Sequence, residues 1–139
     1  MPVVPLDHEI LASLATTYNP TRPVYMLNLW KYRTEAKYAP GESALAGEPC
    51  SGREASNRYI TAITPLMPKD FELHFTSSVA GLISAPEGEQ HWDTVEIVKY
   101  PTLEGFRKMM ESKEYLETAQ PHRVAALEDF RLIMLDKMG

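Results

Sequence analysis

Residues 24–33 read VYMLNLWKYR, and this stretch constrains the fold more than any other part of the chain. Val, Tyr, Leu and Trp favour a β-strand, in which alternate side chains point to opposite faces of a sheet. One set of alternate positions is Tyr25, Leu27, Leu29 and Lys31, and the other is Met26, Asn28, Trp30 and Tyr32. Both sets are rich in large apolar side chains, so the strand predicts a sheet with two half-buried faces, one of which carries an amide.

The remaining segments supply a cover for one of those faces. In the first half of the chain we expect a helix at 7–17 capped by Asp7, the strand at 24–33, an irregular segment at 34–52 and a helix at 53–66 capped by Ser51. In the second half we expect strands at 72–83 and 92–100 joined by a polar loop at 85–91, then a helix started by Thr102, a helical segment at 121–126 and a strand at 129–135. Right-handed crossovers fold this order into a four-stranded antiparallel sheet with both helices on one face. We therefore predict a single α+β domain over residues 1–139 with the ferredoxin-like βαββαβ arrangement.

Composition and charge exclude several classes of protein. The chain has 139 residues, of which 44% are hydrophobic and 24% charged, as is usual for one globular domain. Its formal net charge is −5 and it has no basic stripe, which argues against a nucleic-acid partner. No apolar run reaches the length of about 18 residues that a membrane helix needs, and the N-terminal residues lack the pattern of a signal peptide. Cys50 is the only cysteine, so we expect a cytoplasmic protein without an internal disulfide.

Alternation along the strands predicts which residues share a face. We expect the more aliphatic set to meet the helices: Leu27, Leu29, Leu73, Phe75, Val79, Val95 and Ile97. The opposite face then carries Met26, Asn28, Trp30, Tyr32, His74, Thr76, Ser78, Trp92, Thr94, Glu96, Val98 and Tyr100. This second set mixes aromatic rings with a few hydrogen-bonding groups, which is the composition of a ligand pocket. Since one sheet cannot enclose a ligand, we predict a homodimer whose two sheets pack face to face around it.

A resemblance to a known superfamily agrees with this arrangement. The residues that carry it are MLNLWKY at 26–32, WDTVEIVKYP at 92–101, FRKMMESKEY at 106–115 and HRVAALEDF at 122–130. Over about residues 22–137 the chain resembles the dimeric α/β-barrel superfamily, which includes EthD-like proteins and cofactor-free antibiotic-biosynthesis monooxygenases, and it is most similar to a small family of unknown function. The resemblance implies a ferredoxin-like dimer. It leaves the chemistry open, because the superfamily includes oxygenases, cyclases, isomerases, decarboxylases and dehalogenases.

Three residues of the mixed face are the candidate catalytic groups. His74 and Glu96 are expected to lie close enough to form an acid–base pair, in which the carboxylate orients the imidazole. Asn28 has donors and an acceptor that can hold a substrate carbonyl or enolate oxygen. The alternative for all three is a set of satisfied hydrogen bonds within a dimer interface.

Further residues are candidates for substrate binding. Trp30 and Trp92 are expected to form an aromatic wall, with Thr76, Tyr32 and Tyr100 near it, although plain packing is an alternative role for both tyrosines. His122 follows Pro121 at a predicted helix start, where the helix dipole disfavours a cation and lowers the pKa of an imidazole. Arg123 can bind an acidic substrate group or pair with Glu114 or Glu128, and both His122 and Arg123 have a structural role as the alternative.

The sequence predicts a small, cofactor-independent enzyme. It has neither a metal-binding spacing of His and carboxylates, nor a glycine-rich phosphate loop, nor a Gly-x-Ser-x-Gly motif. The expected reaction is proton transfer on an aromatic or polyketide-like carbonyl compound, leading to isomerisation, cyclisation, elimination or decarboxylation. Three alternatives stay open: a cofactor-free monooxygenase, a small-molecule-binding or stress-response module without chemistry, and a face that serves only as a dimer interface.

Overall fold

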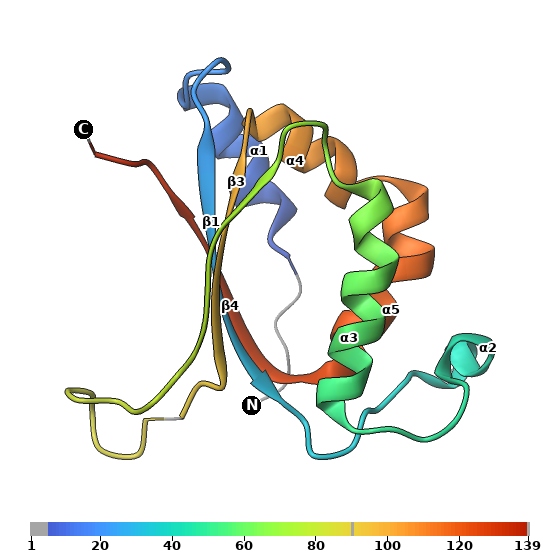
Figure 1. Cartoon of the computed structure of the whole chain (residues 1–139). Coiled ribbons are helices and arrows are strands. Elements are labelled where there is room, and N and C mark those ends of the chain that lie inside the picture. The colour runs from blue at the N-terminus through green and yellow to red at the C-terminus, as the bar shows by residue number, and fades with distance from the viewer. Residues whose placement is uncertain (1–5, 90, 139) are drawn as a thin grey trace.

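The computed structural model describes residues 6–89 and 91–138, so residue 90 of the predicted loop 85–91 and residues 1–5 and 139 of the predicted domain lie outside it. The helices and strands are α1 (His8–Thr17), β1 (Val24–Tyr32), α2 (Ser43–Ala46), α3 (Gly52–Ile63), β2 (Glu72–Ser78), β3 (Thr94–Tyr100), α4 (Leu103–Met110), α5 (Gln120–Ala126) and β4 (Leu127–Leu135). Short 3₁₀ turns occupy Pro40–Glu42 and Thr64–Leu66, and a π-helical segment, Tyr115–Ala119, leads into α5. Figure 1 shows these elements as a sheet with helices packed on one side.

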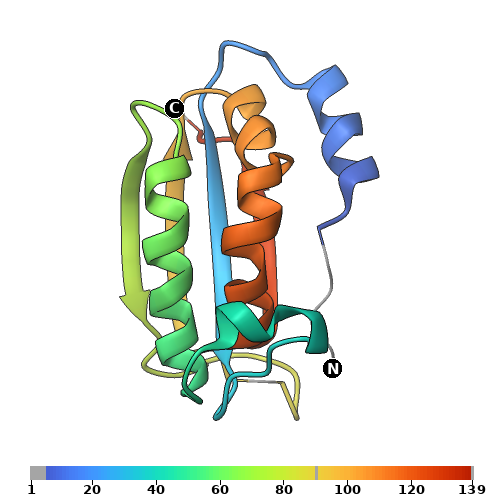
Figure 2. The same ribbon diagram turned by 90° about the vertical axis from the view of Figure 1, so that its right-hand side faces the viewer.

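The four strands form one antiparallel sheet in the order β2-β3-β1-β4. In Figure 2, α3 and the run from α4 to α5 lie side by side over one face of this sheet, with α1 beside them. The fold is therefore α+β and consistent with the predicted ferredoxin-like arrangement. Asn28, at the centre of β1, pairs with Glu96 of β3 on one side and with Leu132 of β4 on the other.

Three side chains cap the helices as their sequence positions predict. The Asp7 carboxylate accepts hydrogen bonds from the backbone N–H groups of Glu9 and Ile10 at 3.1 and 3.0 Å. Ser51 accepts one from Glu54 at 3.0 Å, and Thr102 accepts one from Gly105 at 3.1 Å. Each cap satisfies an amide at the first turn of its helix that has no partner within the helix.

The ends of several elements differ from the prediction. The strand predicted at 72–83 ends at Ser78, and just beyond it the N–H of Val79 donates to the carbonyl oxygen of Asp93 in the neighbouring chain segment, at 3.0 Å. The segment at 34–52 is more ordered than a plain loop: it contains α2, and a single bridge pairs Glu35 with Ser51. The guanidinium of Arg58 holds this segment to α3, because it donates to the carbonyl oxygens of Ala46 and Glu48 at 2.6 and 3.1 Å.

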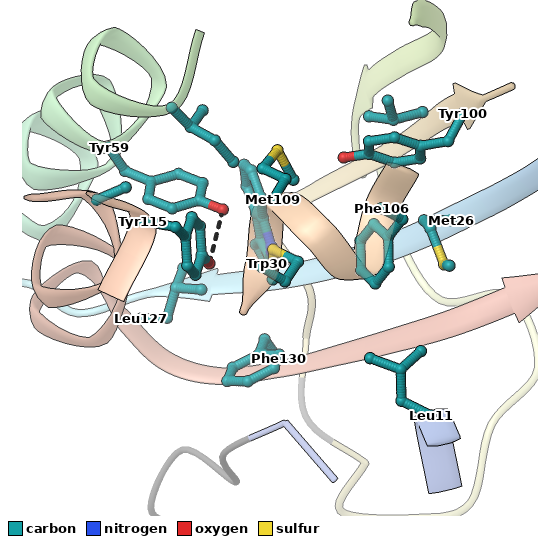
Figure 3. Packing of buried hydrophobic residues seen from close by; sticks show 14 of the residues in the cluster. Leu11, Met26, Trp30, Tyr59, Tyr100, Phe106, Met109, Tyr115, Leu127 and Phe130 are labelled. Atoms are coloured by element: carbon teal, nitrogen blue, oxygen red, sulfur yellow. Dashed lines mark hydrogen bonds between the residues drawn. The ribbon is translucent and has the colours of Figure 1, made fainter. Parts of the chain in front are cut away.

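The predicted assignment of β1 and β3 to the two faces of the sheet is wrong. The helices cover the face that carries Met26, Asn28, Trp30, Glu96 and Val98, which we call the inner face. Met26 and Trp30 are only 2% and 4% exposed there, and Trp30 meets Tyr59 of α3 edge to face, with ring centroids 6.4 Å apart. Figure 3 shows Trp30 and Met26 among side chains of the helices.

The opposite face, which we call the outer face, has no cover within the described residues. It carries the aliphatic set of β1 and β3 together with two exposed side chains of the edge strands: Leu27, Leu29, Val95, Ile97, Phe75 and Ile133. The helices cover the face with the aromatic side chains because large aromatic rings bury more apolar surface than branched aliphatic chains, and because the helices offer aromatic partners. In β2 a register shift between Leu73 and Phe75 brings Leu73 to the inner face, as predicted, and sends Phe75 to the outer face.

Candidate functional site

A cavity of about 290 Å³ lies between the inner face and the helices. Its wall is largely apolar, with methionine, isoleucine, leucine, phenylalanine and tryptophan side chains. The groups that contribute hydrogen-bonding atoms are Asn28, Trp30, Tyr59, Thr64, Glu96, Tyr100 and Arg123, and the indole Nε1 of Trp30 has no hydrogen-bond partner among the described residues. An apolar cavity with a few convergent polar groups is the usual form of a small-molecule site, and this volume is at the lower end of such sites, which hold about 300–1,000 Å³.

Glu96 places a carboxyl group at the middle of this cavity. It projects from β3 beside Asn28 of β1 and is only partly accessible. Desolvation by burial raises its pKa above the ordinary value of 4.5, although the positive charge of Arg123 and a hydrogen bond with Thr76 act in the opposite direction. A carboxylate with a raised pKa is a stronger proton acceptor than one in water.

Asn28 is oriented by the backbone of the sheet. Its Nδ2 donates to the carbonyl oxygens of Met26 and Glu96 at 3.3 and 3.4 Å. Both amide hydrogens are thereby engaged, which leaves Oδ1 as the atom that can accept a hydrogen bond from a ligand. That Asn28 holds a carbonyl or enolate oxygen stays a prediction, and this role would use an Nδ2 hydrogen in place of one of the two bonds to the backbone.

Arg123 of α5 is a buried cation in the cavity wall. The residue is 7% exposed, and its guanidinium carbon lies 4.6 Å from the ring centre of Phe130 and 5.7 Å from that of Trp30. Nη1 donates to the hydroxyl of Tyr59 at 3.3 Å, and that hydroxyl is 3.1 Å from the hydroxyl of Tyr115. Figure 3 shows this tyrosine pair beside Trp30. The aromatic cage fixes the guanidinium in place by cation–π contact.

Tyr100 contributes a phenol to the other end of the cavity. Its ring packs edge to face on Phe106 with centroids 5.0 Å apart, and its hydroxyl contacts the sulfur of Met67 at 3.9 Å. Burial raises the pKa of Tyr100 well above its ordinary value, so the phenol remains protonated at neutral pH and able to donate a hydrogen bond. Since a thioether is a weak acceptor, a ligand oxygen is a better partner for this hydroxyl.

His74 does not join this group, and the predicted His74–Glu96 pair is wrong. The imidazole contacts the ring of Tyr25 edge to face at 5.1 Å, and its Nδ1 lies 3.7 Å from Glu72. Tyr25 alternates with the inner-face residues Val24 and Met26 and pairs with Lys99, so this contact lies on the outer side of the sheet. The register shift of β2 at His74 separates the imidazole from Glu96.

Three other predicted contacts also lie outside the cavity. Trp92 is buried under the guanidinium of Arg131, at 5.3 Å from the ring centre, and Arg131 pairs with Leu29 of the outer face. Tyr32 bonds to Thr94 at 3.0 Å between their side-chain oxygens and does not line the cavity. Thr76 does not line the cavity, but its side chain forms a hydrogen bond with Glu96, which does.

His122, a predicted substrate-binding residue, lies in a separate cleft between α3 and α5, away from the cavity that Arg123 lines. Its Nδ1 is 2.6 Å from the hydroxyl of Tyr38, and the two rings meet edge to face. Desolvation and the nearby charge of Arg58 lower the pKa of His122, against a smaller opposing effect of Glu42. This environment keeps the imidazole neutral and ties α5 to the segment that precedes α2.

The sequence places Tyr59 in the apolar stripe of its helix and gives it no role in the site. The structure shows that its hydroxyl is the link between Arg123 and Tyr115. The sequence does indicate that Tyr59 makes a polar contact, because the hydroxyl of a buried tyrosine needs a hydrogen-bond partner, whereas a phenylalanine at the same position would need none. The partner on the π-helical segment could not be foreseen, since π-helical turns are rare and have no simple sequence pattern, although they occur often at functional sites.

Neither a metal site nor a membrane span is found among the described residues. In residues 6–89 and 91–138 there is no group of three or more His, Cys, Asp or Glu side chains arranged to hold a metal ion. Across the same part of the chain, no helix has the length and apolar character needed to cross a bilayer.

Comparison with known proteins finds a structural neighbour of unknown function. The crystal structure of RPA0582, a structural genomics target from Rhodopseudomonas palustris, aligns with a TM-score of 0.84 and 28% sequence identity over 100% of this chain and 99% of that one. The crystal structure of methylated RPA0582 aligns with a TM-score of 0.82 and 29% identity over 99% and 96%. No family model matches the chain, and no curated protein matches it.

Proposed function

We propose that the protein is a small enzyme that transfers a proton next to a carbonyl group of a cyclic or aromatic compound, without a cofactor. The observation that carries the proposal is the placement of a single carboxyl group, Glu96, in an apolar cavity with hydrogen-bonding groups on either side of it. Such a cavity excludes most water from the reacting atoms and gives the carboxylate the basicity that proton abstraction needs.

The proposed step assigns a role to each polar group. The carboxylate of Glu96 removes a proton from the carbon beside the carbonyl. The electron pair of that C–H bond forms a C=C bond to the carbonyl carbon, and the π pair of the C=O bond moves to the oxygen. The phenol of Tyr100 donates a hydrogen bond to this oxygen as it gains negative charge. Oδ1 of Asn28 accepts a hydrogen bond from a substrate hydroxyl. Return of the proton to a different carbon gives an isomer, and loss of a leaving group gives elimination.

A cofactor-free oxygenase is the second candidate, because it starts from the same carbanion. The resemblance to EthD-like proteins and antibiotic-biosynthesis monooxygenases favours it, and membership of that superfamily is part of the proposal. In that case molecular oxygen would combine with the carbanion, and consumption of oxygen would accompany turnover.

We also propose that two copies pair through their outer faces, as the dimeric α/β-barrel architecture implies. Phe75 and Ile133 of this face are 51% and 42% exposed, and the aliphatic side chains of β1 and β3 lie between them. A contiguous apolar surface of this kind is unusual on a protein that stays monomeric. The pairing differs from our sequence prediction, because the ligand cavity lies within each protomer and not between the two sheets.

Exchange of carbon-bound hydrogen tests the proposed activity whatever the final product is. Acetophenone and phenylpyruvate, each incubated with the protein in D₂O, are followed by proton NMR at the carbon beside the carbonyl. We expect the native protein to accelerate exchange for at least one of them, and Glu96→Gln to lose roughly a hundredfold or more of that rate. His74→Gln is the matched control and should keep the native rate, because its imidazole lies outside the cavity.

The outcomes separate the alternatives. A compound that binds in the cavity but exchanges no faster than in buffer would support a binding module and contradict the enzyme. Loss of exchange in His74→Gln with retention in Glu96→Gln would contradict the assignment of the base. Oxygen uptake together with exchange would favour the oxygenase.

A further inference from the structure

The buried guanidinium of Arg123 has no carboxylate at ion-pairing distance among the described residues. No carboxylate oxygen in the described part of the chain lies within 4.0 Å of it, and its one hydrogen bond is from Nη1 to the neutral hydroxyl of Tyr59. Nη2 is buried and has no hydrogen-bond partner among the described residues. An arginine stays charged at any physiological pH, and a buried charge without a partner is strongly destabilising.

The sequence-predicted partners do not neutralise Arg123. Neither Glu114 nor Glu128 forms an ion pair with it within the described residues, and Glu96 influences it only from beyond ion-pairing distance. The aromatic rings of Trp30, Tyr59 and Phe130 offer cation–π stabilisation, with the guanidinium carbon 4.6–5.7 Å from their centres. Such contacts stabilise the cation but supply no hydrogen-bond acceptor for Nη2.

We propose that Arg123 is an anion-binding subsite of the cavity, and that the natural ligand is a small aromatic or cyclic carboxylate. Three observations support it: Arg123 lines the cavity, its Nη2 hydrogens have no acceptor among the described residues, and the rest of the cavity wall is largely apolar, as an aromatic or cyclic ligand requires. Planar guanidinium groups match carboxylates through paired hydrogen bonds. Tyr59 and Tyr115 fix the Nη1 side, which leaves Nη2 for the ligand.

The positions of the polar groups define the order of groups on that ligand. Trp30, beside Arg123, is two residues from Asn28 on β1, and Asn28 pairs with Glu96. The carboxylate therefore lies at the Arg123 end, and the carbon that loses its proton lies near Glu96. This placement rests on the proposed function, whereas anion binding at Arg123 does not.

Binding of benzoate and benzamide to the intact protein tests the subsite. The two molecules have nearly the same shape and differ in charge. By titration calorimetry we expect benzoate to bind at least about tenfold more tightly than benzamide, a difference of about 1.4 kcal/mol. Arg123→Met keeps much of the length of the side chain and should remove the preference, while Arg123→Lys should retain part of it. Glu96→Gln should strengthen benzoate binding, because it removes a negative charge from the same cavity.

Each outcome bears on the subsite separately from the activity. Thermal unfolding of each variant shows whether it is folded, and if Arg123→Met does not fold, the benzoate-to-benzamide ratio in Arg123→Lys and Glu96→Gln decides. Equal affinity for the two molecules, no benzoate binding at millimolar concentration, or an unchanged preference in the arginine variants would overturn the proposal. A benzoate preference in a protein that catalyses no hydrogen exchange would support the subsite and count against the proposed enzyme.

Discussion

The two faces of the sheet are built from the same strands, yet they differ in chemistry. The inner face alternates aromatic or sulfur-containing side chains with Asn28 and Glu96, and the helices close over it. The outer face is aliphatic at its centre, where Leu27, Val95 and Ile97 lie, and carries Tyr25 and Lys99 towards one end of β1 and β3. Polar groups in an apolar setting need partners or a ligand, whereas aliphatic groups need only a surface to pack on. The difference therefore separates a site for a ligand from a surface for another protein chain.

The largest expected contrast between the faces is in stability. Trp30→Ala empties the centre of the inner core and should lower the free energy of unfolding by about 3–5 kcal/mol. Phe75→Ala removes a ring of similar kind from the outer face, where it is half-exposed, and should cost less than about 1.5 kcal/mol in the monomer. Urea unfolding at low protein concentration measures both. Equal losses would mean that the outer face is as tightly packed as the inner one.

A charge on the outer face should break the proposed dimer. Ile97→Lys places an ammonium group where two sheets would meet, and we expect it to weaken dimerisation by roughly a hundredfold, about 2.7 kcal/mol. Leu116→Lys is the control, because Leu116 is exposed on the π-helical segment, away from the sheet. Sedimentation equilibrium compares the two with the native protein. A native protein that remains monomeric at high micromolar concentration would refute the pairing.

Glu96 should make the inner face less stable as the pH rises. Its raised pKa means that the fold favours the protonated form, so the stability it contributes is present below its ordinary pKa of 4.5 and is lost as the pH rises through the folded-state value. Glu96→Gln should therefore be more stable than the native protein at pH 8, and the difference should vanish near pH 4. Thermal unfolding across this range measures it, and a pH-independent difference would contradict the burial of the carboxyl.

The smallest expected effect lies away from both faces, at His122. Its lowered pKa means that the fold favours the neutral imidazole, so the stability it contributes is present above its ordinary pKa of 6.5 and is lost as the pH falls through the folded-state value. His122→Gln should reduce the loss of stability between neutral pH and pH 5. Amide hydrogen exchange in residues 34–51 should report the same change, because His122 bonds to Tyr38. Native-like acid sensitivity in this variant would assign that loss to other groups.

Much of the fold followed from local sequence rules, and the errors came from choices that depend on the whole structure. The caps of Asp7 and Ser51 and the alternation of β1 were readable, because each depends on neighbours in the chain. The prediction exchanged the inner and outer faces because the alternation of side chains divides each strand into two sets of residues but does not show which set meets the helices. Only the packing of Trp30 against Tyr59 decides that choice.

The site was predictable in part for the same reason. The prediction placed four of the cavity residues on one face of the sheet, and the structure also has them on one face: Asn28, Trp30, Glu96 and Tyr100. The prediction was wrong only about which face the helices cover, because these residues occupy alternate positions of two adjacent strands. His74 was lost because a one-residue register shift is invisible in the alternation of β2. Arg123 was recognised as a possible anion contact, but its lack of a counter-charge among the described residues depends on the fold of α5 and could be seen only in three dimensions.

The location of a bound ligand relative to the sheet distinguishes the two faces most directly. The methyl groups of methionine and isoleucine, labelled with ¹³C, report on both faces: Met26, Met67 and Met110 line the cavity, and Ile97 and Ile133 lie on the outer face. On titration with benzoate we predict shifts at the three methionines and unchanged signals at the two isoleucines. Shifts confined to Ile97 and Ile133 would contradict a ligand site between the inner face and the helices.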